Sequence, residues 1–234
     1  MIKLKYLFTI LILFFSANFL ICQNATTKVT FYKALKNLTD KTNSPPKQLK
    51  GINFSLIFNQ EESLFYLEDE LNSDISPNNE RFIHYGGGDG KFYCNINDAY
   101  DLHQTEFSGK FFLIQKKREK YNWSITKESK KINDYTCYKA LTELKVKNEI
   151  TKKEITQKIE VWFSPEISFP FGPSGYDGLP GLVLEVKVGG VYFIANKIEF
   201  NDESKIEKPT KGKEIKEDEF EKLVAKVFRD NFKR

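Results

Sequence analysis

The sequence is poor in the side chains that metal sites and nucleophilic catalysis use most often. It contains three cysteines, two histidines and one methionine in 234 residues. Thirteen glycines and eight prolines are too few for a collagen-like or low-complexity chain. Aromatic residues make up 15% of the chain, which excludes an intrinsically disordered protein. The composition therefore indicates one ordinary globular domain, or at most a small pair.

An excess of charge of either sign is also missing. The chain has 36 basic and 32 acidic side chains, and Lys3 and Lys5 lie in a segment that we expect to be removed. The mature chain would then carry a net charge of only +2. This balance argues against nucleic acid or an anionic membrane as the main partner.

Long apolar runs are absent except at the N-terminus. A short cationic start is followed by an apolar run from Leu7 to Cys22 and then by polar residues. This order predicts a secretory signal peptide over residues 1–22, cleaved before Gln23. The alternatives are a membrane anchor, for which the run is short, and a lipoprotein acylated at Cys22, for which Ile21 is too bulky. We expect an exported protein that is periplasmic, associated with the outer membrane or secreted, with no transmembrane span in the mature chain.

Two cysteines, Cys94 and Cys137, remain after the signal peptide is removed. In an exported chain, an even pair predicts a disulfide. Such a bridge would close a loop of 43 residues and contribute about 4 kcal/mol. Two unpaired buried thiols are the alternative. With only His84 and His103 as further soft ligands, and no paired-ligand spacing, a zinc site is poorly supported.

Alternation of apolar and polar residues is the dominant pattern along the chain, and it is clearest in residues 155–163. It predicts a mainly β (α+β) protein with an antiparallel, curved meander sheet. The predicted strands cover residues 52–58, 64–67, 111–115, 122–126, 136–146, 155–163, 182–187 and 191–200. Residues 23–200 would form this β-rich domain.

Residues 201–234 are predicted to form a charged linker and a C-terminal amphipathic helix. The apolar stripe of the helix consists of Phe220, Leu223, Val224, Val227 and Phe228. Acidic residues precede this stripe and basic residues follow it, as the helix dipole favours. We expect the helix to pack on the sheet; a free helix that binds a partner is the alternative. In the linker, Gly212 should tolerate substitution.

The motifs that resemble enzyme sites are incomplete. The run from Gly86 to Lys91 resembles a phosphate-binding loop, but Tyr85 stands where the first glycine is needed and Phe92 replaces the metal-binding hydroxyl. No nucleophile elbow is present, and each histidine is more typical of an ordinary structural residue. No cofactor and no enzyme activity are expected.

One segment does form a complete motif. It runs into a predicted strand and consists of Gly178, Leu179, Pro180, Gly181, Leu182, Val183, Leu184 and Glu185. It resembles the signature of the GLPGLI family, exported proteins of Bacteroidetes without an assigned function, with Val183 in place of isoleucine. Upstream, residues 135–140 and 162–167 resemble further elements of that family. The resemblance covers roughly residues 50–200.

The residue types of this signature segment favour a shaped corner. Gly178 and Gly181 permit positive φ or a close backbone approach, and Pro180 fixes its own φ. The alternatives are an edge that docks a partner and a ligand-binding or catalytic loop. In that last case Asp177 and Glu185 would be the plausible acid and base.

Three classes of function follow from these observations. The first is a non-enzymatic binding or structural module for an outer-membrane or secreted protein, and the lack of a catalytic constellation favours it. The second is a carrier of an apolar ligand in a pocket lined by some of the 21 phenylalanines. The third is a carboxylate-based hydrolase, which needs two acids that face a shared cleft.

Overall fold

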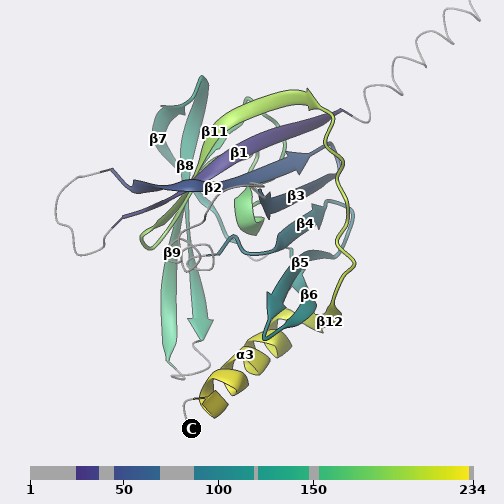
Figure 1. The fold of residues 1–234 in the computed structure, drawn as a ribbon. Helices are drawn as coiled ribbons and strands as arrows, with labels where there is room; N and C mark the ends of the chain where they lie inside the picture. Colours follow the sequence, from purple (N-terminus) through teal and green to yellow (C-terminus); the bar gives the residue numbers. More distant parts are fainter. Residues whose placement is uncertain (1–24, 37–44, 69–86, 119–120, 148–152, 232–234) are drawn as a thin grey trace, which may run out of the picture.

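The computed structural model describes residues 25–36, 45–68, 87–118, 121–147 and 153–231 (Figure 1). The predicted signal peptide, the start of the mature chain at Gln23, and His84 lie outside these residues. Within them, the protein is mostly β, with one sheet and one C-terminal α-helix. None of the described helices is long and apolar enough to cross a membrane.

The strands occupy most of the described chain. They are β1 (Thr26–Leu35), β2 (Lys47–Phe58), β3 (Glu62–Leu67), β4 (Lys91–Asn95), β5 (Tyr100–Phe107), β6 (Lys110–Lys117), β7 (Ser124–Ile132), β8 (Tyr135–Lys147), β9 (Glu154–Ser164), β10 (Leu182–Val188), β11 (Val191–Asp202) and β12 (Lys213–Lys216). The helices among the described residues are the short 3₁₀ helix η1 (Pro173–Gly175) and α3 (Glu217–Asn231).

The twelve strands form one open sheet in the order β12-β6-β5-β4-β3-β2-β1-β11-β10-β9-β8-β7. Strands β2 to β6 form one antiparallel meander, and β7 to β11 form a second. Strand β1 joins the two meanders, because it pairs with β2 on one side and β11 on the other. The short β12 runs parallel to β6. The predicted mainly β, antiparallel fold with one C-terminal helix is therefore confirmed.

The core around β1 is built from phenylalanine rings. Phe54 and Phe65 stack with 5.4 Å between ring centroids, and Phe193 meets them edge-on at 5.3 and 5.8 Å. Phe31 meets Phe65 edge-on at 6.2 Å. All four rings are buried. Because these rings pack against one another, this part of the core is closely packed.

Helix α3 contacts the β5–β6 end of the sheet. The ring of Phe220 lies 5.2 Å from that of Phe112 and 5.9 Å from that of Phe107. At the start of the helix, Glu217 forms an ion pair with Lys116 of β6, with 3.2 Å between oxygen and nitrogen. The first turn carries three acidic residues, which complements the helix dipole.

The segment expected to be a linker is partly ordered as a strand. Residues 213–216 form β12, and Gly212 precedes it with φ +128°. A Cβ at Gly212 would lie 2.8 Å from backbone atoms of Phe111 and Phe112. The expectation that this glycine tolerates substitution is therefore wrong, because the linker pairs with β6 directly after it.

The predicted disulfide between Cys94 and Cys137 is also wrong. Both thiols are free and buried. Cys94 lies on β4 and Cys137 on β8, and six strands separate β4 from β8 in the sheet order. The sequence suggested the pair only because two cysteines remain after the predicted signal peptide. Burial raises the pKa of the Cys137 thiol to about 11, so it behaves as a small apolar side chain.

Candidate functional site

The signature segment forms a tight corner before β10. Gly178 has φ +83° and donates its N–H to the carbonyl oxygen of Pro170 at 3.0 Å. Leu179 turns inward and is 2% exposed. A Cβ on Gly181 would lie 2.3 Å from the backbone oxygen of Ser164, the last residue of β9. A side chain at position 181 is therefore incompatible with this approach of the two backbones.

Beyond the corner, the signature enters the core. Leu182, Val183 and Leu184 have no exposed surface. The Leu182 N–H donates to the Ile167 carbonyl oxygen, and the Val183 N–H donates to that of Phe171, both at 2.9 Å. These bonds attach the incoming strand to the loop that precedes the corner.

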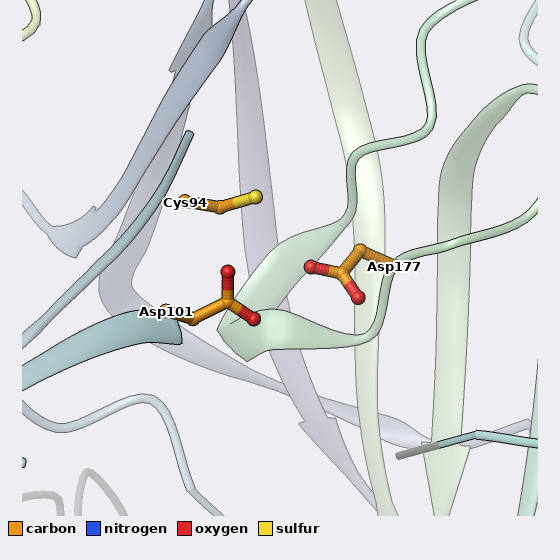
Figure 2. A group of neighbouring side chains, drawn as sticks. All are labelled: Cys94, Asp101 and Asp177. Atoms are coloured by element: carbon orange, nitrogen blue, oxygen red, sulfur yellow. The ribbon is translucent and has the colours of Figure 1, made fainter. Parts of the chain in front are cut away.

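The two signature carboxylates have different surroundings. Glu185 of β10 accepts from Lys130 Nζ at 2.6 Å, and the same ammonium lies 4.4 Å from the centre of the Trp162 ring. Asp177 instead faces Cys94 and Asp101 (Figure 2). Glu185 thus contributes to an ion pair between β10 and the edge strand β7, whereas Asp177 belongs to a separate buried cluster.

We call Cys94, Asp101 and Asp177 the thiol–carboxylate cluster. Figure 2 shows the three side chains converging from three segments of the chain. The Cys94 sulfur and one carboxylate oxygen from each aspartate all lie within 4.8 Å of one another. Each residue is only 6% or 7% exposed. Two carboxylates and a thiol rarely share so little space away from water without a compensating interaction.

Local structure places each member of the cluster. Cys94 is on β4 and Asp101 on β5, the two strands of a hairpin whose turn begins at Asn95. The Asn95 side chain accepts the Asn97 N–H at 2.9 Å, and the Arg118 guanidinium donates to the Asn95 backbone oxygen. These bonds fix the turn that brings Asp101 back beside Cys94.

Asp177 reaches the cluster from the loop between η1 and the corner. Gly172 allows this loop to be compact, since a Cβ there would lie 2.0 Å from the Tyr176 carbonyl oxygen. The Trp123 indole N–H donates to the backbone oxygen of Asp177 at 2.8 Å. Asp177 is therefore held through its backbone, which leaves its carboxylate directed toward β4 and β5.

A small cavity of about 20 Å³ lies at the cluster. All three members line it, together with Ser63 and Lys116. A space of this size admits one water molecule or one ion. It is far too small for an organic substrate.

The electrostatics of the site suppress ionisation of the thiol. Burial raises the pKa of Cys94 well above its usual value, and the negative charges of Asp101 and Asp177 raise it further. The positive charge of Arg118 opposes them. Burial likewise raises the pKa of Tyr176 to about 12. At neutral pH the thiol is therefore protonated and a poor nucleophile.

The Gly-rich turn lies in a different place and packs on the core. The fully buried Lys33 donates from Nζ to the Gly87 carbonyl oxygen at 2.7 Å. A Cβ at Gly88 would lie 2.9 Å from the Phe193 ring. His103 stacks on Phe92 with 3.9 Å between ring centroids, and its Nε2 lies 2.9 Å from the Asp89 carbonyl oxygen. The described part of the turn is thus bound to the sheet.

Comparisons with known proteins cover part of the sequence and most of the fold. A family model described as "Protein of unknown function (Porph_ging)" matches residues 123–185, a stretch that includes the whole signature. No curated protein matches the sequence. The GLPGLI resemblance therefore remains a prediction, alongside a match to a family that is itself uncharacterised.

Two solved structures of PNGF-II, in space groups C2 and P2₁, resemble this chain. Their TM-scores are 0.54 and 0.56, with 16% sequence identity in each case. The alignments cover 86% of this chain but only 32% and 33% of the PNGF-II chains. The chain thus spans about a third of the length of PNGF-II, and at this identity the similarity shows the fold alone.

Proposed function

We propose that this protein is an exported, non-enzymatic binding module of the cell envelope that recognises a protein partner. The open edge of β7, with exposed apolar side chains beside it, is the observation that supports this proposal. The cavity of about 20 Å³ at the thiol–carboxylate cluster is too small for an organic substrate, with or without a bound ion.

The two alternatives receive less support. A carboxylate hydrolase needs two acids around a cleft, but Asp177 and Glu185 face different partners. An open hollow of about 690 Å³ beside β3 and β5 is lined by Glu68, Asp89 and Glu106, but Glu68 forms an ion pair with Lys28, and Asp89 accepts a hydrogen bond from Thr105. A carrier needs an apolar cavity, whereas the central phenylalanine rings contact one another. We therefore propose neither alternative.

The edge strand β7 is the surface that best suits a protein partner. Within the part of the chain that the structure describes, the sheet is open and β7 pairs with β8 alone, with a register shift between Ile125 and Ser129. An exposed strand edge offers unpaired backbone donors and acceptors to an added strand. Beside it lie three exposed apolar side chains, Ile125 (53% exposed), Tyr138 and Leu141 (each 38% exposed). Backbone pairing would give affinity, and these side chains would give specificity.

Site-specific photo-crosslinking in the native host tests this proposal. A crosslinking residue at Ile125 should capture one discrete envelope protein. The same residue at Phe200, which is equally exposed on β11 but away from the β7 edge, serves as the matched control and should not capture it. Capture at both positions alike, or at neither, would contradict a docking surface on β7.

A further inference from the structure

The thiol–carboxylate cluster has the donor set of a metal site. We propose that Cys94, Asp101 and Asp177 bind one divalent cation of the Zn²⁺ class. This inference goes beyond the proposed function and does not depend on it, because its test measures metal binding by the cluster and not capture of a partner at the β7 edge.

The positions of the donor atoms carry the first part of the argument. Zn–S bonds of about 2.3 Å and Zn–O bonds of about 2.1 Å place neighbouring donors of a tetrahedral site roughly 3.5 Å apart. The three donor atoms already lie within 4.8 Å of one another. An ion bound by all three would therefore have to draw the donor atoms together by about 1 Å.

The cavity is a second, independent observation. It occupies about 20 Å³, it is lined by all three donors, and it has room for one ion or one water. A closely packed interior leaves few such spaces, and this one is polar on the side of the cluster. Ser63 also lines the cavity, and either its hydroxyl or a water molecule would supply the fourth ligand.

Two cationic side chains of the protein lie near the cluster. Lys116 lines the cavity but forms an ion pair with Glu217 of α3. Arg118 donates to the backbone oxygen of Asn95. A divalent ion in the cavity would place further positive charge beside two buried carboxylates, which is electrostatically favourable whatever other contacts they make.

The donor types select the class of ion. A thiolate with two carboxylates suits Zn²⁺ and its relatives, while Ca²⁺ and Mg²⁺ require six or more oxygen ligands. Binding replaces the thiol proton: the Cys94 S–H bond breaks, a sulfur–metal bond forms, and the proton passes to solvent. No electron transfer is involved.

Metal titration of the purified, chelator-treated protein is the test. One equivalent of Zn²⁺ should raise the melting temperature to a plateau. Co²⁺ should give one equivalent of thiolate-to-cobalt charge-transfer absorption. Neither signal at micromolar metal would overturn the proposal, and a shift given by Ca²⁺ or Mg²⁺ but not by Zn²⁺ would overturn the assigned class of ion.

Variants assign the signals to the cluster. Cys94→Ser should abolish the cobalt absorption, and Asp101→Asn should weaken Zn²⁺ binding at least tenfold. Cys137→Ala, which removes the other buried thiol, and Asp98→Asn, on the same hairpin but exposed and paired with Lys208, should leave both signals unchanged. Melting of each variant without metal verifies folding, and Asp177→Asn replaces Asp101→Asn should the latter not fold. Loss of the absorption in Cys137→Ala but not in Cys94→Ser would refute the assignment.

Discussion

The two meanders on either side of β1 differ in the length of their strands and in the contacts that stabilise them. The β7–β11 side has long strands, including β8 with 13 residues and β9 with 11, which pair without a break from Tyr138–Phe163 to Lys147–Glu154. It also contains the signature corner. The β2–β6 side contains the 5-residue β4 and two members of the thiol–carboxylate cluster, Cys94 and Asp101, whereas Asp177 comes from the loop between β9 and β10. Long paired strands and a tight corner stabilise the first side, and contacts of buried polar side chains add to strand pairing in the second. The following experiments separate these two kinds of stabilisation.

The largest expected effect is at the corner of the β7–β11 side. Gly181→Val should lower the free energy of unfolding by about 4 kcal/mol or more, because even a Cβ would lie 2.3 Å from the Ser164 oxygen and valine adds a β-branch. Urea denaturation measures this change. Gly189→Asn, in the β10–β11 turn with φ +59° and open space where a Cβ would stand, should cost below about 1 kcal/mol. Equal stability of the two variants would contradict the structural role of the corner.

Lys33 of β1 gives the next largest effect, and it depends on pH. Burial lowers the pKa of Lys33 from 10.5 to about 8, and the charge of Asp89 partly opposes this shift. Between these pH values the unfolded chain binds a proton that the folded protein does not, so stability should rise with pH. The rise should reach about 3 kcal/mol across that window.

The Lys33→Met variant isolates this contribution. Its free energy of unfolding should lack the rise between pH 8 and 10.5, as measured by urea denaturation at several pH values. Lys197→Met, on the exposed part of β11, is the control and should follow the wild type. A parallel pH dependence in wild type and Lys33→Met would show that Lys33 has an ordinary pKa in the fold.

A smaller effect is expected where β7 attaches to the signature. Lys130→Met should lower the free energy of unfolding by about 1 kcal/mol, since it breaks the 2.6 Å ion pair with Glu185 and the contact with the Trp162 ring. The double variant with Glu185→Gln should be less destabilised than the sum of the two single variants. Strict additivity would show that the two charges do not interact.

The smallest effect is expected from reducing agents. Because Cys94 and Cys137 are both free, a reductant should leave the melting temperature unchanged within about 1 °C, whereas loss of a bridge closing 43 residues would cost about 4 kcal/mol. Alkylation after denaturation without reductant should modify both residues. A mass that corresponds to two unmodified, bonded cysteines would contradict the structure.

How much of the fold the sequence predicts differs between the two sides. Residues 155–163 and 136–146 alternate clearly, and they form β9 and β8 with nearly the predicted limits. Strands β1, β4, β5 and β12 are not predicted. β4 is only five residues long, and β5 buries the polar residues Asp101, His103 and Thr105, so that its inward face carries no apolar pattern. Their strand conformation depends on pairing partners elsewhere in the chain.

The candidate site is beyond sequence reasoning for a related physical reason. Cys94 and Asp101 are joined by a hairpin that the sequence pattern does not predict, and Asp177 comes from a loop far along the chain. Ligand-spacing rules detect donors on one local element, whereas here the sheet topology brings them together. Sequence reasoning identifies Asp177 as a candidate acid, but with Glu185 as its partner. The corner at Gly181, by contrast, follows from local backbone geometry, and the predicted close approach is present.

The central position of β1 has a consequence for how the chain acquires its fold. Thr26 pairs with Asp202, and its hydroxyl donates to a backbone oxygen 176 residues further on. Strand β1 therefore cannot complete its pairing until β11 is available, and only then can the two meanders join. Such non-local pairing makes folding slow, on the order of milliseconds to seconds, and leaves the edges of both meanders unpaired in the meantime. We expect the sheet to complete only after nearly the whole chain is available, which makes protection by a chaperone valuable during that interval.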